Sequence, residues 1–187
     1  MDRIFTSLAS VTILLMLIAL GLGLALHAAN PRDVASESAT GWYRTHFMVG
    51  VAVGLAVVLV NSLVMTWFIG TSRWCKEVAD TYSLDRNLID RSNRIKRGAF
   101  PFALANMLII VGALALGGAA DPSGNLQVAP PGGLSWAQWH LVGAVTALAV
   151  VFAGSVAEWR AIRENQQIIQ EVVGEVARIR RERGLPA

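Results

Sequence analysis

Four long runs of apolar residues, none of which contains a charged side chain, constrain this chain more than any other feature of its sequence. The runs cover about residues 4–26, 47–69, 100–120 and 141–157. Roughly 20 apolar residues suffice for a helix to cross the hydrocarbon core of a bilayer, where a helix satisfies its own backbone hydrogen bonds. Because the runs also lack the alternation of a β-strand, we predict an all-α integral membrane protein, a bundle of four transmembrane helices surrounded by the lipid bilayer.

The first run needs to be distinguished from a signal peptide. It is longer than an ordinary signal-peptide core, and Asp2 and Arg3 before it cancel in charge. No clean small-x-small cleavage site directly precedes Asn30, where His27 stands three residues before. We therefore interpret the first run as the first membrane helix.

The basic residues predict the orientation of the helices. Of the 16 Lys and Arg residues, all but Arg32 and Arg44 lie before the first run, between the second and third runs, or after the fourth run. By the positive-inside rule we expect both termini to be cytoplasmic, in a multi-pass protein of the bacterial inner membrane. The net charge of +3 then reflects topology. Since no aromatic platform or groove-reading motif accompanies the basic residues, we expect no nucleic acid as a partner.

A Trp-x-x-x-His spacing occurs twice, as Trp42 with His46 and as Trp136 with His140. The two copies lie 94 residues apart, and sliding the whole chain by 94 without a gap gives 17 identities in 93 aligned pairs. Composition alone produces some identities between apolar helices, but the matched Trp and His residues are not explained in that way. We interpret the pattern as an internal duplication.

Each repeat, residues 1–93 and residues 95–187, would form a two-helix membrane hairpin followed by a cytoplasmic helical extension. Because each repeat has an even number of spans, both have the same orientation, and we expect a pseudo-two-fold axis along the membrane normal. This axis would place His46 and His140 at the same depth.

Small residues four apart occupy equivalent places in the two repeats, Ala19 with Gly23 and Ala113 with Gly117. Such spacings let helices approach closely in lipid, where no hydrophobic effect drives them together. We expect the first and third helices to meet at these residues. Packing alone would explain the pattern, and the alternative is a cleft in which a flat or bulky group lies between the helices.

His46 and His140 are the candidate binding residues. Each could simply be a solvated side chain next to an aromatic belt at the membrane surface. The alternative is that both ligate one b-type haem iron, since axial ligation of this kind needs two neutral imidazoles on facing helices. Gly50 and Gly143 would then leave room for the porphyrin edge, and Arg44 could meet a propionate. Ligation of a bacteriochlorophyll by single histidines is a less economical version of the same hypothesis.

The segments after the second and fourth runs are predicted to continue as helices. A three-four apolar spacing marks the last of them, with Ile162, Ile169, Val172, Val176 and Ile179. This stripe would either pack on the rest of the chain or, if exposed, dock a partner protein or a second copy. Residues 83–97 mix apolar and basic side chains, and we expect a short amphipathic return helix at the inner surface.

Catalytic signatures are missing from the sequence. It has no phosphate-binding or dinucleotide-binding glycine motif, no H-E-x-x-H and no nucleophile elbow, and its one cysteine cannot form an internal disulfide. The apolar runs carry no ionisable residue, which argues against a transporter or proton channel. His27, Asp33, Glu37 and Asp121 on the outer side form a weak alternative site for a divalent ion.

Two function classes remain open at this point. The first is a non-enzymatic membrane scaffold or accessory subunit of a membrane complex. The second is a small bis-His b-type haem electron carrier that uses His46 and His140. In neither case do we expect an enzyme.

Overall fold

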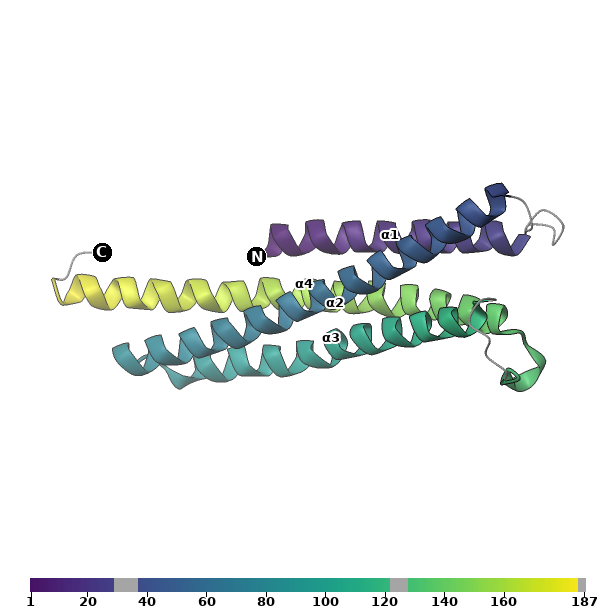
Figure 1. Cartoon of the computed structure of the whole chain (residues 1–187). Helices are drawn as coiled ribbons and strands as arrows, with labels where there is room; N and C mark the ends of the chain where they lie inside the picture. Colours follow the sequence, from purple (N-terminus) through teal and green to yellow (C-terminus); the bar gives the residue numbers. More distant parts are fainter. Residues whose placement is uncertain (29–36, 122–127, 185–187) are drawn as a thin grey trace.

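The computed structural model of the chain is all-helical, and it describes residues 1–28, 37–121 and 128–184. Four long helices make up the fold: α1 (Asp2–Ala28), α2 (Glu37–Tyr82), α3 (Arg86–Ala120) and α4 (Trp136–Glu182). A short 3₁₀ turn, η2 (Pro131–Gly133), precedes α4. The four helices run along one common direction, and α1 is the shortest (Figure 1). The prediction of a four-helix, all-α bundle is confirmed.

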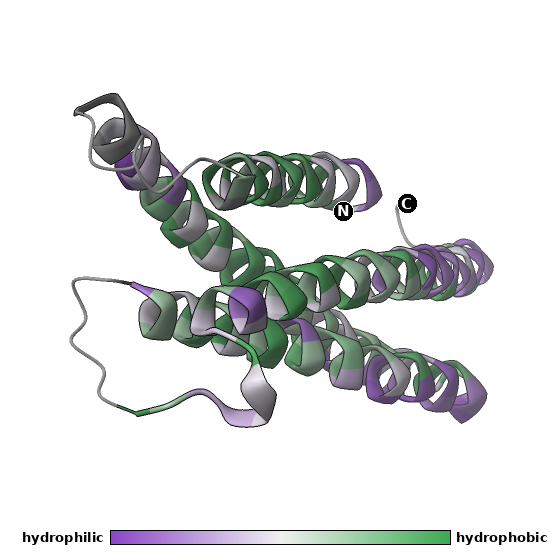
Figure 2. Cartoon of the chain, turned by 90° about the vertical axis from the view of Figure 1, so that its right-hand side faces the viewer, coloured by the Kyte–Doolittle hydropathy of each residue, from purple (hydrophilic) through white to green (hydrophobic). Residues whose placement is uncertain are grey.

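All four helices are long and apolar enough to span a membrane. The apolar residues extend along most of α1, whereas polar residues gather at the far ends of α3 and α4 in Figure 2. Large apolar side chains such as Leu14, Leu55 and Leu108 are exposed on the outside of the bundle. An apolar outer surface over this length is what a bilayer requires of the helices within it.

The ends of the helices define the two ends of the bundle. The last turn of α1 and the first turns of α2 and α4 lie at one end, which carries His46 and His140 and is called the histidine end below (Figure 1). The connection from α2 to α3 and the end of α4 lie at the other, called the turn end. The predicted continuation of the second and fourth helices is confirmed, since α2 runs unbroken to Tyr82 and α4 to Glu182.

Three buried clusters follow one another along the bundle. The cluster toward the histidine end contains Met16, Val53, Val57, Ile110, Ala113, Ala147 and Val151. The middle cluster contains Phe5, Ala9, Val60, Val64, Phe68, Ala99 and Ile162. The cluster at the turn end contains Cys75, Ala79, Leu84, Leu88, Ile168 and Val172. The core is therefore continuous, and in two of the three clusters every helix contributes to it.

Residues 83–97 do not form a separate return helix, so that prediction is wrong. Ser83 has a positive φ of 54°, and the N–H of Leu84 donates to the carbonyl of Ala79 over 2.9 Å, which closes the end of α2. Asp85 then caps α3 by accepting from the N–H of Asn87. Leu88 is buried at the turn end, so this segment packs as the first part of α3.

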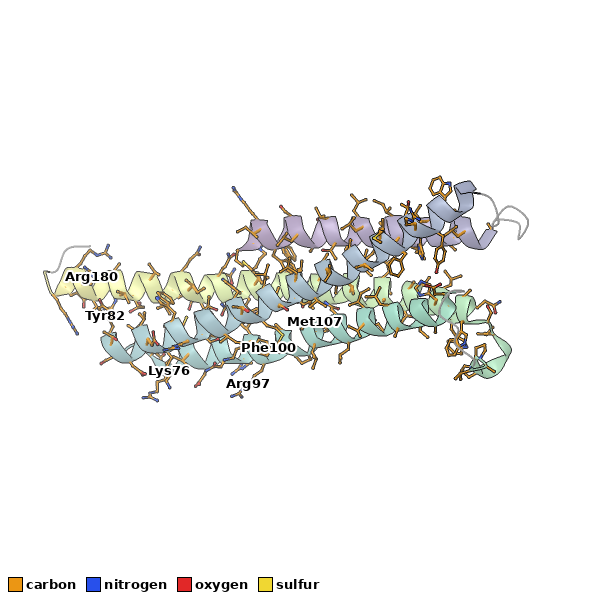
Figure 3. All side chains as sticks on the ribbon, in the orientation of Figure 1. Lys76, Tyr82, Arg97, Phe100, Met107 and Arg180 are labelled. Carbon is orange, nitrogen blue, oxygen red and sulfur yellow. The ribbon has the colours of Figure 1, made fainter. Side chains whose placement is uncertain are left out.

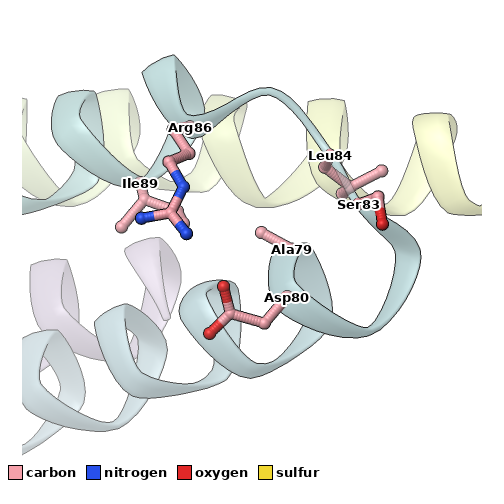
Figure 4. A pocket seen from close by; sticks show the side chains of 6 residues that line it. All are labelled: Ala79, Asp80, Ser83, Leu84, Arg86 and Ile89. Atoms are coloured by element: carbon pink, nitrogen blue, oxygen red, sulfur yellow. The ribbon is translucent and has the colours of Figure 1, made fainter.

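The tight α2–α3 turn leaves a small pocket at its inner side. Ala79, Asp80, Ser83, Leu84, Arg86 and Ile89 line it. Figure 4 shows the side chains of Asp80 and Arg86 on either side of this pocket. The pocket follows from the sharp reversal of the chain.

The apolar stripe on the last part of α4 is internal. Ile168 and Val172 are fully buried against Cys75 and Ala79 of α2, and Ile169, Val176 and Ile179 pack around them. Long charged side chains in the half of the bundle toward the turn end project outward, as Lys76 of α2 and Arg97 of α3 do in Figure 3. Of the two alternatives for the stripe, packing on the chain itself describes this structure.

The expected contact between the first and third helices is also wrong. Within the described residues, no Cα atom of α1 comes within 8 Å of a Cα atom of α3, whereas α1 packs against α2 and α4. The small residue that does allow close approach to α3 is Gly54 of α2, which lies against the side chain of Leu114. The four helices therefore enclose the core as a ring of neighbours, with α2 and α4 also in contact with each other.

Candidate histidine site

The imidazole rings of His46 and His140 lie next to one another at the histidine end of the bundle. Their centroids are 6.0 Å apart, and their planes are inclined by 75°. His46 lies near the start of α2 and His140 near the start of α4, and both rings are partly buried. The two histidines that the repeat spacing singled out are thus brought together by the fold.

Each ring is held by a backbone carbonyl of the preceding helix. Nδ1 of His46 lies 3.1 Å from the carbonyl oxygen of Ala19 in α1, and Nδ1 of His140 lies 3.0 Å from the carbonyl oxygen of Ala113 in α3. A carbonyl oxygen only accepts, so Nδ1 carries the proton in both rings and donates it. The lone pair of a neutral imidazole is then on Nε2, which is the arrangement that second-shell carbonyls impose on metal-binding histidines.

The glycines four residues after these alanines support the faces of the rings. A Cβ atom at Gly23 would lie 3.0 Å from Cε1 of His46, and a Cβ atom at Gly117 would lie 2.9 Å from Cε1 of His140. Both distances are shorter than ordinary van der Waals contact. The Ala-x-x-x-Gly motifs therefore build two histidine cradles, one within each pair of sequential helices, and do not join α1 to α3.

Gly50, Gly143 and Arg44, the other residues of the predicted haem site, differ in what surrounds them. A Cβ atom at Gly50 would meet nothing within 4 Å, so open space lies beside it. The side chain of Leu116 lies 2.7 Å from the Cβ position of Gly143, so in this structure a leucine occupies the space that the prediction assigned to a porphyrin edge. Arg44 is exposed, two residues before His46.

The tryptophans near the two histidines differ in their roles. Trp136 and Trp139 hold the start of α4 by hydrogen bonds, whereas Trp42 faces outward at the start of α2. Trp136 Nε1 donates to the carbonyl of Val128 at 2.9 Å, and Trp139 Nε1 donates to the carbonyl of Pro131 at 3.0 Å. A capping box between Ser135 and Gln138 fixes the same turn. Trp42 is 58% exposed, consistent with a side chain at the surface of a bilayer. The start of the helix that carries His140 is thus rigidly defined.

The histidine pair brings two imidazoles together. Among the described residues, no group of three or more His, Cys, Asp or Glu side chains could hold a metal ion. Of the weak alternative for a divalent ion, Asp33 and the side chains of His27 and Glu37 lie outside the described residues. Two imidazoles that donate from Nδ1 could offer Nε2 to an iron that brings its four remaining ligands with it, as haem iron does.

A second polar region lies deeper in the bundle, where three asparagines form hydrogen bonds between the helices. Asn106 Nδ2 donates to Asn61 Oδ1 at 3.1 Å, and Asn61 Nδ2 donates to the carbonyl of Val57 at 2.7 Å. The two asparagines thus join α2 to α3 by a buried hydrogen bond. Nearer the turn end, Asn165 of α4 accepts from Ser92 of α3 and donates to Thr71 of α2. These bonds satisfy most of the buried amides.

Sequence reasoning missed Glu158, whose side chain is 0% exposed. It directly follows the fourth apolar run, residues 141–157, where a charged residue ordinarily marks the return of a helix to water. A signal was present: the apolar stripe of α4 starts at Ile162, and one helical turn earlier along the same face lies Glu158. In the register of 94 it also aligns with Val64, which is buried.

The comparisons with known proteins do not assign the chain to a class. No protein-family model matches it, and neither the curated proteins nor the solved structures contain a match. The geometry of the two histidines is therefore the feature that points to a function.

Proposed function

We propose that this protein is a membrane-embedded b-type haem protein, a small electron carrier in which His46 and His140 are the axial ligands of one haem. The observation that carries the proposal is the juxtaposition of the two rings, whose centroids are 6.0 Å apart. Two imidazoles on opposite sides of one iron have ring centres on the order of 6 Å apart, since each iron–nitrogen bond is about 2 Å long. The separation of the rings therefore matches bis-His ligation.

The hydrogen bonds of the histidines support the same function. Each Nδ1 donates to a carbonyl, so each Nε2 is available to iron without loss of a proton. The two cradles belong to different helix pairs, α1 with α2 and α3 with α4, so a flat group between the rings would lie between these pairs. The open space beside Gly50, one turn after His46, favours this placement, and exposed Arg44 is the candidate partner of a propionate.

We further propose a bacterial inner-membrane protein with both termini in the cytoplasm and the histidine end outside. The distribution of the basic residues supports this orientation. An internal duplication of residues 1–93 and 95–187 is supported by the matched contacts: Nδ1 of each histidine binds the carbonyl 27 residues earlier, and a glycine 23 residues earlier lies against each ring. The duplication gives a single haem two equivalent ligands.

The visible spectrum of the protein tests the function. Purified in detergent from haem-replete cells, the protein should show a sharp α band in the reduced-minus-oxidised spectrum. His46→Ala and His140→Ala should each remove the six-coordinate spectrum, and His27→Ala, which changes the one remaining histidine of the chain, should keep it. A colourless protein that gains no spectrum when haem is added would overturn the proposal.

A colourless protein would leave the second candidate, a non-enzymatic scaffold or accessory subunit. The feature that favours it is an apolar groove between α1 and α4, lined among others by Ile13, Leu17, Phe152 and Trp159. Such a groove can accept an apolar segment of a partner protein or of a second copy. Cross-linking in membranes from a cysteine placed at Leu17, in a Cys75→Ser background, would detect either one.

A further inference from the structure

Glu158 of α4 is a buried carboxyl group that the fold does not pair. Its side chain is fully buried, and neither carboxyl oxygen has a hydrogen-bond partner among the described residues. An unpaired charge in such a place is strongly destabilising, and buried polar groups in proteins are almost always hydrogen-bonded. Something that the protein chain does not supply must therefore compensate this group.

A second unpaired acceptor lies one helical turn away. Asn106 of α3 is also fully buried; its Nδ2 donates to Asn61, but its Oδ1 has no partner in the described part of the chain. The amide group of Asn106 lies against Gly154, where any side chain would collide with it. Gly154 and Glu158 are four residues apart, so they occupy the same face of α4, about 6 Å apart along the axis. Two unpaired oxygen atoms of Glu158 on α4 and one of Asn106 on α3 thus lie along the same face of α4.

The surroundings supply neither a donor nor a counter-charge. The next turn of α4, at Ile162, packs in a cluster formed by Phe5 and Ala9 of α1, Val60, Val64 and Phe68 of α2, and Ala99 of α3. The charged groups nearest along the helices are Asp2 and Arg3 on α1, Lys96 and Arg97 on α3, and Arg160 on α4, while α2 has none between Arg44 and Arg73. None of these forms an ion pair with Glu158 in the described structure.

We propose that Glu158 and Asn106 form a buried binding site for one monovalent cation, either a proton or a sodium ion, in the core of the bundle. The ligands are all oxygen atoms, which suits a proton or a hard cation. One carboxylate neutralises a single positive charge, so a divalent ion would leave a net charge in an apolar core. This site is separate from the histidines: Glu158 lies 18 residues beyond His140 on α4, which is about 27 Å along the helix.

The burial of Glu158 determines whether the protein becomes more or less stable as the pH rises. A carboxyl group that keeps its proton in the folded protein, while the unfolded chain releases it, makes the protein less stable as the pH rises. If sodium replaces the proton, adding sodium at alkaline pH restores the stability, because a ligand that binds only the folded state stabilises it. The two cations can therefore be distinguished in one experiment.

The test measures the Tm of the full chain in detergent from acidic to alkaline pH, in choline chloride and in sodium chloride. Wild-type protein should lose Tm with rising pH in choline chloride, relative to Glu158→Gln, which carries a neutral isostere and should not show this loss. Glu164→Gln is the matched control, since Glu164 is exposed on the same helix, and it should behave as wild type.

Each outcome has one meaning. Recovery of the wild-type Tm in sodium chloride identifies sodium, and a pH-dependent loss without recovery identifies the proton. If wild-type protein and Glu158→Gln show the same dependence on pH and on sodium, the proposal is wrong. Should Glu158→Gln fail to fold, Glu158→Val provides the same comparison, because the aligned residue in the first half is Val64, which is buried without difficulty.

Discussion

Asn165 donates a hydrogen bond from its Nδ2 to Oγ1 of Thr71, at 3.1 Å, and these two residues are 94 positions apart in the chain. The same spacing separates His46 from His140, whose rings meet at the opposite end of the bundle. The proposed duplication implies a pseudo-two-fold axis, and residues related by the spacing of 94 would touch one another only close to it. Two such contacts, one at the histidine end and one nearer the turn end, are what an axis along the bundle predicts.

The contact at Asn165 predicts a measurable coupling between α2, α3 and α4. Asn165→Ala would leave the hydroxyl groups of Thr71 and Ser92 without their buried partner, so we expect a loss of about 1–3 kcal/mol in the free energy of unfolding. Thr71→Val should cost less, because it leaves one buried group, Nδ2 of Asn165, without its partner, whereas Asn165→Ala affects both Thr71 and Ser92. A double-mutant cycle in detergent measures the coupling, and strictly additive effects would show that the bond contributes nothing.

The two histidine cradles predict that Gly23 and Gly117 are sensitive to the smallest side chain. Gly23→Ala and Gly117→Ala place a Cβ atom at 3.0 and 2.9 Å from the imidazole, so each ring must shift away from its carbonyl. We expect destabilisation of about 1–3 kcal/mol, typical of overpacking, together with weaker haem binding.

Gly21→Ala and Gly118→Ala are the matched controls for the cradles. A Cβ atom at either position meets nothing within 4 Å, so both variants should keep the stability and the spectrum of the wild type. Equal behaviour of all four variants in thermal unfolding would show that the cradle contacts have no energetic role.

The topology predicts different labelling at the two ends of the bundle. Single cysteines at Ser38 and Gly132, in a Cys75→Ser background, should react with a membrane-impermeant thiol reagent in intact cells, because the histidine end is expected outside. A cysteine at Asn93, between α2 and the apolar part of α3, should react only after lysis. Protection of the first two positions in intact cells would reverse the proposed orientation.

The bidentate ion pair between Arg91 and Glu171 is expected to contribute little to stability. Its two N–O distances are 2.6 and 3.1 Å, but the side chains are 39% and 43% exposed. Exposed ion pairs contribute about 0–1 kcal/mol, so Glu171→Gln should lower the Tm only slightly and less at high salt. A large, salt-independent loss would instead indicate that the pair fixes the packing of α3 on α4.

The sequence alone determined the number of helices, their continuation beyond the apolar runs and the pairing of two histidines. These features depend on local composition and on a spacing of 94, which are both visible in one dimension. The turn between α2 and α3 was misjudged because residues 86–97 have an amphipathic pattern that suits a surface helix as well as one packed in a bundle. Burial of Leu88 against α2 and α4 decides between the two.

Only the tertiary structure decided which neighbouring side chain each small residue contacts. The sequence does not show which neighbour a glycine in a helix faces. The same Ala-x-x-x-Gly spacing therefore predicts close packing of two helices as readily as a cradle for an imidazole. The orientation of α1 against α2, and of α3 against α4, turns Gly23 and Gly117 toward the histidines and fills the space at Gly143 with Leu116. The burial of Glu158 also depends on how its helix is oriented. A residue just beyond an apolar run can face water or the core, depending on the rotation of the helix about its own axis. Packing of α4 against the other three helices fixes that rotation.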